Sequence, residues 1–235
     1  MTNNYYSDFE SIKRLISVDC VIFGYDDEQL KLLVFKRIIE PSKGKWSLLG
    51  GWVKNDESSE EAAHRVLHHL TGLKYIYQEQ VETFSKPGRD PGGNVITVEY
   101  YALIKIDEFT NQLISDYGAK WFALKDLPSL IFDHDILVVK ALDKLRLKAS
   151  YELFGKHLLP EKFTILKLRK LYNEIYQKEF DPANFRKKVL SLNVLERLEE
   201  KDKTESRKGA YLYRFKDVPE MEISGPVFRK SFVKK

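Results

Sequence analysis

Residues 51–73 read GWVKNDESSEEAAHRVLHHLTGL, and this stretch decides how the first half of the chain folds. Ser58 is followed three residues later by Glu61, which is the pattern of a capping box at the start of a helix. Apolar residues recur at helical spacing from Ala62 onward, and Gly72 is a residue type that often follows the last turn of a helix. The stretch therefore predicts a glycine-led loop followed by one amphipathic helix.

On both sides of this helix the sequence alternates in the manner of β-strands. Residues 12–25 and 30–39 are two β-rich runs across a short polar turn, which predicts a hairpin. Further elements follow, with strands predicted at 80–84, 95–106 and 120–122 and a second helix at 130–147. A β-rich half with one central and one late helix predicts an α/β sandwich.

The composition bounds the class of protein. The 235 residues suffice for two domains, and the single cysteine, Cys20, excludes a disulfide framework and a multi-cysteine zinc site. The first residues lack the pattern of a signal peptide, and no apolar run approaches the roughly 18 residues of a spanning helix. We expect a soluble protein of the reducing cytoplasm, without a membrane partner.

The charges divide the chain at Glu152. Residues 1–152 hold 19 Lys and Arg against 23 Asp and Glu, a net charge of −4, whereas residues 153–235 hold 20 against 12, a net charge of +8. This asymmetry predicts two domains, 1–152 and 153–235, of which the second meets a polyanion. The alternative is a solvated basic tail.

The basic half has a pattern of its own. Residues 165–176 form a predicted amphipathic helix capped by Thr164, and Asp181-Pro182 starts a second, basic helix that reaches residue 190. Two β-rich runs follow, at 192–199 and 210–215, separated by a polar stretch. Helix, turn, helix and β-ribbon in this order are typical of a winged helix-turn-helix domain.

Such a domain would bind double-stranded operator DNA with its second helix and its ribbon. Phe185 and Val189 are at core spacing, so the polar residues between them are expected to face the major groove. The predicted DNA-binding residues are Asn184, Arg186, Lys187 and Lys188 on the helix and Lys201, Lys203, Arg207 and Lys208 in the ribbon loop. The alternative is a basic helical module that binds a protein partner and no DNA.

The opening stretch resembles the Nudix box, the motif of the Nudix hydrolase family. The matching positions are Gly51, Glu57, Arg65, Leu67, Gly72 and Leu73. The resemblance implies the Nudix fold, an α/β/α sandwich, and hence an α+β chain in which this sandwich precedes the winged helix. We expect Arg65 to be kept for structure, in a pair with Glu57 or with loop carbonyls.

The departures from the box concern its chemistry. The family's three metal-binding glutamates would fall at 66, 69 and 70, where this chain has Val66, His69 and Leu70. Hard divalent cations need oxygen ligands, so we expect no metal, no cofactor, no catalytic residues and no hydrolysis. An active hydrolase with an unusual metal site is the alternative. His64 and His68 lie one helical turn apart, but a polar helix face explains them better than a zinc site.

A Nudix fold without a metal still has a cleft in which a small molecule could bind. Glycines would allow close approach of the ligand to the backbone, and aromatic and charged side chains would stack on a sugar and bond to it. The expected effector-binding residues are Lys36, Arg37, Trp46, Gly50, Gly51, Arg89, Asp90 and Tyr100.

Nearly the whole chain resembles the Nudix-related transcriptional regulator family. The segments that carry the resemblance are GRDPGG at 88–93, FDHDILVVKALDKLR at 132–146 and FDPANFRKKVL at 180–190. The resemblance implies a homodimeric repressor that releases its operator when a small molecule occupies the Nudix cleft. The chain looks most similar to the branch that responds to L-arabinose. The alternative is the branch that responds to ADP-ribose and controls NAD metabolism.

Overall fold

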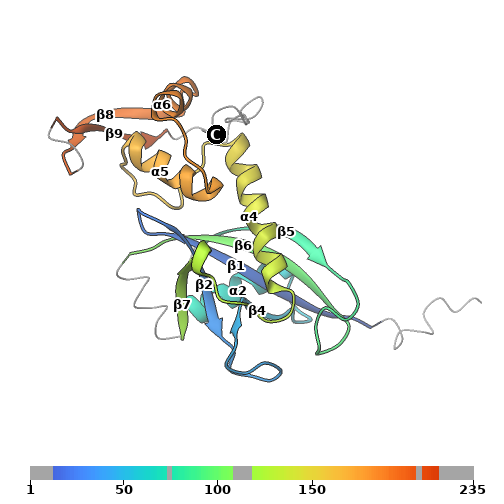
Figure 1. Ribbon diagram of the computed structural model, residues 1–235. Coiled ribbons are helices and arrows are strands. Elements are labelled where there is room, and N and C mark those ends of the chain that lie inside the picture. Colours follow the sequence, from blue (N-terminus) through green and yellow to red (C-terminus); the bar gives the residue numbers. More distant parts are fainter. Residues whose placement is uncertain (1–12, 73–75, 108–117, 205–207, 217–235) are drawn as a thin grey trace, which may run out of the picture.

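The computed structural model describes residues 13–72, 76–107, 118–204 and 208–216. They form a mixed sheet with helices on both faces and, beyond one end of it, a small helical unit with a β-ribbon (Figure 1). The elements of the larger part are β1 (Leu15–Tyr25), β2 (Leu30–Lys36), β3 (Trp46–Ser47), β4 (Leu49–Trp52), α2 (Ser59–Thr71), β5 (Tyr77–Phe84), β6 (Val95–Lys105), β7 (Ala119–Ala123), η1 (Leu124–Asp126) and α4 (His134–Tyr151).

Strand β1 is the centre of the sheet. It pairs with β2 across the predicted hairpin, in antiparallel fashion, and with β6 in parallel along its whole length. The main order is β3-β2-β1-β6-β5, while β4 pairs with the first part of β1 and β7 pairs with β2. The parallel pairing of β1 with β6 brings residues from distant parts of the sequence into register, such as Asp19 with Glu99.

The two faces of the sheet carry separate cores. Val18, Cys20 and Ile22 of β1 belong to the core beneath α2, whereas Val21 and Phe23 belong to the core beneath α4. Successive side chains of a strand point to opposite faces, so a strand that is apolar on both faces must be covered on both. The predicted α/β/α sandwich is confirmed.

The predicted start and end of α2 are confirmed. The Ser58 hydroxyl accepts a hydrogen bond from the backbone N–H of Glu61, and the Glu61 carboxylate accepts one from the N–H of Ser58. Gly72 ends the helix with a φ of 67°, a conformation that glycine adopts without strain.

Helix α4 begins at His134 and not at residue 130 as predicted. Phe132 has a φ of 53°, in the left-handed region, so a helix cannot run through it. Leu130 and Ile131 are nevertheless buried, because the loop that carries them packs against the sheet. Apolar spacing alone therefore placed the helix start too early.

The second unit is the predicted winged helix, built from α5 (Ile165–Tyr176), α6 (Pro182–Ser191), β8 (Leu195–Asp202) and β9 (Ala210–Phe215). Thr164 caps α5 and Asp181 caps α6, as predicted. The first ribbon strand begins at Leu195, later than predicted, because α6 continues to Ser191 and Asn193 makes a turn with a φ of 54°. An isolated β-bridge between Phe163 and Tyr213 joins the ribbon to the segment before α5, a contact that the sequence pattern did not indicate.

The two units share one hydrophobic core, which continues from the α4 side of the sheet into the winged helix. The Tyr172 hydroxyl of α5 accepts a hydrogen bond from the backbone N–H of Phe154 at 2.8 Å and donates one to the carbonyl of Glu152 at 3.1 Å. Glu174 of α5 accepts a hydrogen bond from the N–H of Leu30 on β2. The winged helix is therefore held against both α4 and the sheet.

Replacement of Tyr172 with phenylalanine is expected to lower the free energy of unfolding by about 1–3 kcal/mol, because the buried N–H of Phe154 loses its acceptor. Chemical denaturation measures the change. The exposed Glu28→Gln variant is the control and should change stability by less than about 0.5 kcal/mol. Equal effects of the two substitutions would contradict the assigned role of this hydroxyl.

Among the residues that the structure describes, no helix has the length and apolar character needed to cross a membrane.

Candidate functional site

A cleft of about 320 Å³ opens at the sheet, between the β2–β3 connection and the start of α4. Most of the expected effector-binding residues line it, namely Lys36, Arg37, Gly50, Gly51, Arg89 and Asp90. Lys36 and Arg37 lie at the end of β2, and they reach the same cleft as Arg89 because the sheet brings β1 and β6 together beside β2. The fold thus assembles residues that are more than 50 positions apart in the sequence.

Two expected residues lie elsewhere. Tyr100 faces α2 on the opposite side of the sheet, is buried there, and shares a hydrogen bond of 3.0 Å with the Ser59 hydroxyl. The Trp46 ring contacts the Phe122 ring edge-on. The Lys36 ammonium lies over the Trp46 ring, 5.3 Å from its centre. Neither ring is among the residues that line the cleft, so neither is in place to stack on a ligand there.

The two glycines are required by the protein's own packing and not by a ligand. A Cβ atom at Gly50 would lie 2.3 Å from Oδ1 of Asp19, and one at Gly51 would lie 2.8 Å from a methyl group of Val66. Both distances are too short for any side chain, so glycine lets β4 pass over Asp19 and lets α2 pack closely on β4.

Arg89 lines the cleft but is occupied by a structural contact. Its guanidinium forms two hydrogen bonds of 2.8 Å with the Asp133 carboxylate and a further one with the Thr97 hydroxyl. Asp90 accepts a hydrogen bond from the N–H of Gly92 and shapes the loop. Arg89 therefore ties the loop before β6 to the first turn of α4.

The floor of the cleft carries polar residues that sequence reasoning missed, above all Asp19 and His134. Nδ1 of His134 accepts a hydrogen bond from the backbone N–H of Leu48 at 3.0 Å, so the ring proton lies on Nε2. Nε2 lies 4.0 Å from Oδ1 of Asp19, which is beyond hydrogen-bond distance. Burial lowers the pKa of His134 and raises that of Asp19. A charged residue within the apolar run VDCVIF was the available signal for Asp19.

Glu99 lies beside Asp19 on the neighbouring strand and is fully buried. Neither of its carboxyl oxygens has a hydrogen-bond partner among the described residues. Burial raises the pKa of Glu99 to about 9, with Glu82 and Asp19 adding to the effect. Glu99 is therefore protonated at neutral pH.

This carboxyl group predicts how stability depends on pH. Its pKa is higher in the folded chain than in the unfolded chain, so folding binds a proton between about pH 4.5 and about pH 9. The stabilisation is complete below this window and is lost as the pH rises through it, with a slope of at most about 1.4 kcal/mol per pH unit. Glu99→Gln is expected to remove this slope, as measured by urea unfolding across the window, whereas Glu28→Gln at an exposed position should keep it. Parallel pH profiles of the native chain and Glu99→Gln would contradict the assignment.

The Nudix-box residues do not fit a divalent cation. Glu57, the retained carboxylate, is paired with Arg65, whose hydrogen bonds lower the pKa of Glu57 to about 2. Arg65 also donates to the carbonyl of Trp52, which is the structural role expected for it. Val66 is buried in the core beneath α2, where the family has a glutamate. The described residues hold no group of three acidic, histidine or cysteine side chains that could bind a metal.

The winged helix exposes most of the basic residues that the sequence predicted to bind DNA, although Lys201 lies on strand β8 and not in the ribbon loop. On α6, Phe185 and Val189 are buried, while Asn184, Arg186 and Lys187 are exposed and Lys188 is half-buried. In the ribbon, Lys201, Lys203 and Lys208 are exposed, and Arg207 lies outside the described residues. The α6 surface and the ribbon therefore both carry exposed cations.

A groove of about 370 Å³ lies between these elements. It runs between the starts of α5 and α6 and the ribbon, and Arg169, Arg186 and Tyr211 line it. Arg186 donates a hydrogen bond of 3.3 Å to the Tyr213 hydroxyl, and the cationic groups of Arg197 and Lys201 each lie 4.5 Å from the Tyr211 ring. The ribbon tyrosines thus position cationic side chains whose orientation the sequence pattern could not predict.

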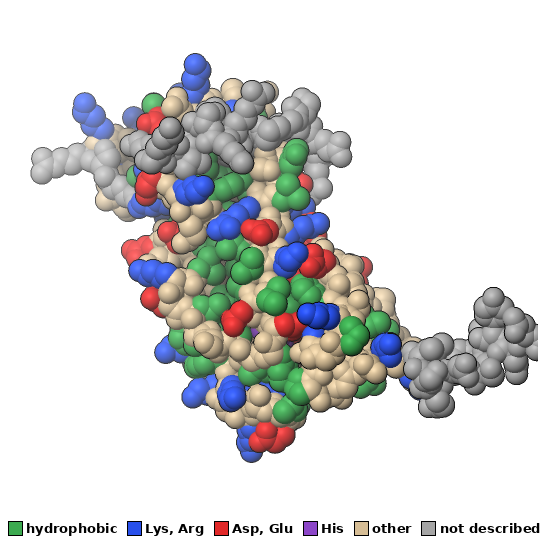
Figure 2. Space-filling model, turned by 45° about the vertical axis from the view of Figure 1, so that its right-hand side comes forward, with side chains coloured by type: hydrophobic (Ala, Val, Ile, Leu, Met, Phe, Trp, Pro, Cys, Tyr) green, Lys and Arg blue, Asp and Glu red, His purple; other side chains and the backbone are tan. Residues whose placement is uncertain are grey.

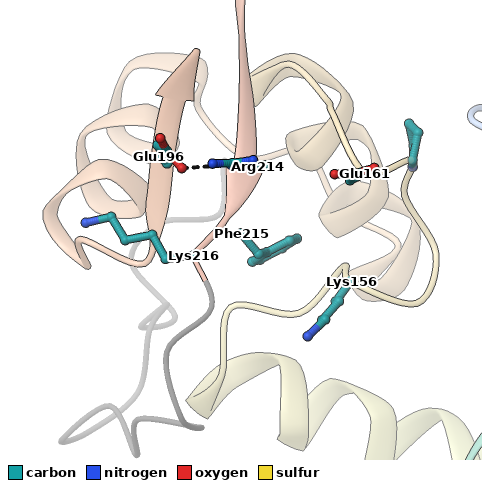
Figure 3. Close-up of a pocket in the computed structure, with 7 residues that line it drawn as sticks. Lys156, Glu161, Glu196, Arg214, Phe215 and Lys216 are labelled. Atoms are coloured by element: carbon teal, nitrogen blue, oxygen red, sulfur yellow. Dashed lines mark hydrogen bonds and ion pairs between the residues drawn. The ribbon is translucent and has the colours of Figure 1, made fainter.

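A second recess in the winged helix, about 580 Å³, lies at the base of the ribbon (Figure 3). Glu196 and Arg214 form an ion pair of 2.7 Å across the ribbon, and Lys216 donates a hydrogen bond to Asn193. Its acidic and basic side chains largely offset one another, so we assign no ligand to it.

Both halves of the chain match known families. Residues 13–142 match the NUDIX domain, and residues 155–215 match the NrtR DNA-binding winged helix domain. The ADPR-responsive transcriptional repressor NtrR of Acinetobacter baylyi is 33% identical over 205 residues, which are 86% of this chain and 82% of that protein. The chain belongs to the NrtR family of Nudix-related transcriptional regulators.

Solved structures of the NrtR family agree with the whole fold. Shewanella oneidensis NrtR in complex with a 27mer DNA is 32% identical, with a TM-score of 0.77 over 90% of this chain and 96% of that one. The NUDIX domain of the same NrtR in complex with ADP ribose is 35% identical, with a TM-score of 0.50 over 60% of this chain and 94% of that one.

These relatives bear on the expected effector. ADP-ribose is named for the Acinetobacter repressor and for the Shewanella NUDIX domain. The assignment to the L-arabinose branch finds no support in them. No residue of the first half distinguished the two effectors in the sequence, because the sequence alone does not show which side chains line the cleft.

Proposed function

We propose that this chain is a repressor that binds operator DNA through α6 and the ribbon and releases it when ADP-ribose occupies the Nudix cleft. The observation that carries the proposal is a cleft with a cationic rim on a fold whose metal-binding carboxylates are replaced. Such a site can bind a nucleoside diphosphate without cleaving it. The names of the two relatives support ADP-ribose as the ligand.

The cleft has the chemistry that this ligand needs. Lys36 and Arg37 at the rim would meet the diphosphate, and Arg37 lies over the Phe132 ring at 5.6 Å. Ile38, Ile39 and Trp52 also line the cleft, and their side chains are more than half exposed. Exposed apolar side chains at the mouth of a cleft would pack against a purine base. L-arabinose, which is uncharged, would use neither the cations nor this apolar surface.

We expect this chain not to hydrolyse ADP-ribose. Without carboxylates at 66, 69 and 70, nothing would hold a cation against the diphosphate, and Glu57 is bound to Arg65. Incubation with ADP-ribose and Mg²⁺ or Mn²⁺ should therefore give no AMP. Steady turnover would favour the alternative of an active hydrolase.

We further propose that the repressor is a homodimer in which α4 of one copy packs on α4 of the other. Helix α4 is apolar on both faces. One face covers the sheet, and the other exposes Ile136, Val139, Leu147 and Tyr151. Figure 2 shows hydrophobic side chains gathered on this side of the molecule, with acidic and basic ones between them.

The charges on this face favour a second copy as its partner. Ile136, Lys140, Asp143 and Leu147 follow one another at helical spacing on the exposed face. When two such helices pair in antiparallel fashion with Ile136 opposite Leu147, Lys140 of each copy lies opposite Asp143 of the other. A two-fold pairing of this kind would also present two recognition helices to a symmetric operator.

Light scattering tests the dimer. The native chain should have the mass of two copies, and Ile136→Lys with Leu147→Lys should have the mass of one. Ile39→Lys, at an exposed position in the connection between β2 and β3, is the control and should remain dimeric. A dimeric double variant would place the interface elsewhere.

Fluorescence anisotropy on the DNA upstream of the gene, titrated with ADP-ribose and separately with L-arabinose, tests the whole proposal. Binding that falls steeply with salt and is reversed by ADP-ribose alone is the expected result. Release of the DNA by L-arabinose would instead support L-arabinose as the effector. Absence of DNA binding at low salt would favour a protein-interaction module.

A further inference from the structure

The floor of the cleft has a feature that the diphosphate and the base do not use. Asp19 and His134 both line the cleft, and both side chains are about nine-tenths buried within the chain. His134 presents an N–H at Nε2, because its Nδ1 accepts the hydrogen bond of Leu48. Asp19 presents carboxyl oxygens, one of which lies 4.0 Å from that Nε2. A donor and an acceptor therefore face each other across a gap.

The gap selects a chemical class of ligand. An atom that lies about 2.8 Å from both groups fits between them, and it must accept a hydrogen bond from His134 and donate one to Asp19. A hydroxyl group does both. A phosphate oxygen would be repelled by the carboxyl group of Asp19, and a cation would face the N–H of His134.

The surrounding contacts fix these two side chains. The Phe132 ring meets the His134 ring edge-on at 5.7 Å, and Asp133 beside it is bound by Arg89. Gly50 leaves the space that the Asp19 carboxyl group fills, since a Cβ atom there would collide with it. The pair is thus held in position before any ligand binds, which limits the entropy lost on binding.

We propose that Asp19 and His134 form a receptor for the hydroxyl groups of the ribose at the far end of ADP-ribose. This inference rests on the proposed function. The cleft is lined by exposed apolar side chains, by the cations Lys36 and Arg37, and by the buried Asp19–His134 pair. These three kinds of group match the adenosine, the diphosphate and the second ribose of ADP-ribose. The receptor makes the cleft selective for a diphosphate that carries a sugar over one that ends in phosphate.

Calorimetric titration of the full chain with ADP-ribose and with ADP tests the receptor. The native chain should bind ADP-ribose at least tenfold more tightly than ADP. His134→Asn keeps an acceptor for Leu48 but removes the N–H that faces Asp19, and Asp19→Ala removes the carboxyl group. Each substitution should weaken ADP-ribose about tenfold, and neither should weaken ADP. Tyr100→Phe, on the other face of the sheet, is the control and should change neither affinity.

The outcomes separate this inference from the proposed function. If a substitution weakens both ligands equally, or neither, the receptor is overturned while ADP-ribose binding stands. If the native chain binds neither ligand, the proposed function fails, and the receptor fails with it. Circular dichroism shows whether each variant is folded, and the two substitutions come from different elements, so either one suffices to decide.

Discussion

Replacement of Arg186 and Lys187 together with alanine is expected to weaken operator binding about 100-fold or more and to leave the Nudix domain folded. Both side chains are exposed on α6, whose buried residues Phe185 and Val189 fix the helix against the rest of the winged helix. A bidentate contact of arginine with a guanine contributes about 1–3 kcal/mol, and each lost phosphate contact lowers the salt dependence of binding. Anisotropy titrations at several salt concentrations measure both effects.

The control for this variant removes the same charge elsewhere. Lys43→Ala with Lys125→Ala changes two exposed lysines of the Nudix domain and should lower operator affinity by less than about threefold. ADP-ribose binding should persist in the Arg186/Lys187 variant, which shows that the sensor is intact. Operator affinity retained in that variant would remove α6 from its role as the recognition helix.

Replacement of Arg89 with alanine is expected to lower the free energy of unfolding by about 3–5 kcal/mol. The Arg89 guanidinium, with 5% of its side chain exposed, forms a two-point pair with Asp133, and its loss leaves that carboxylate without its partner. The first turn of α4 and the loop before β6 then separate more readily. Chemical denaturation measures the loss.

The double variant Arg89→Ala with Asp133→Ala is the matched control. It removes both charges, so its stability should be higher than that of Arg89→Ala alone. If the effects of the two single substitutions simply add, Arg89 acts through something other than Asp133. If Arg89→Ala lowers the free energy of unfolding by less than about 0.5 kcal/mol, the pair with Asp133 does not stabilise the fold. Arg89 would then behave like an ordinary charged residue at the surface.

Local sequence decided the elements whose stabilising contacts lie within a few residues. The capping box at Ser58 and Glu61, the turn at Gly72 and the Asp181-Pro182 helix start were all predicted, because each depends on neighbours along the chain. The same holds for the exposed cations of α6, whose positions follow from the apolar spacing of Phe185 and Val189. The apolar spacing placed the start of α4 too early, because Leu130 and Ile131 are buried in a loop and their spacing resembles that of a helix. The left-handed φ of Phe132 separates this loop from the helix.

The cleft was predicted only in part, since its walls come from strands that pair across long sequence distances. Lys36, Arg37 and Arg89 were placed correctly at its lining, but Tyr100 turned to the other face of the sheet. Successive side chains of a strand point to opposite faces of the sheet, so a shift of one residue moves a side chain to the other face. Only the register between strands therefore determines which side chains meet the cleft.

The sequence by itself determined that this chain is a Nudix sandwich without the metal-binding glutamates, followed by a basic winged helix. Residue type and spacing carry that information directly. Only the tertiary structure decided that Asp19 and His134 face each other at the floor of the cleft, that Arg89 is bound to Asp133, and that α4 is apolar on both sides. These features depend on which side chains meet in space, and that is set by the packing of distant segments on one another.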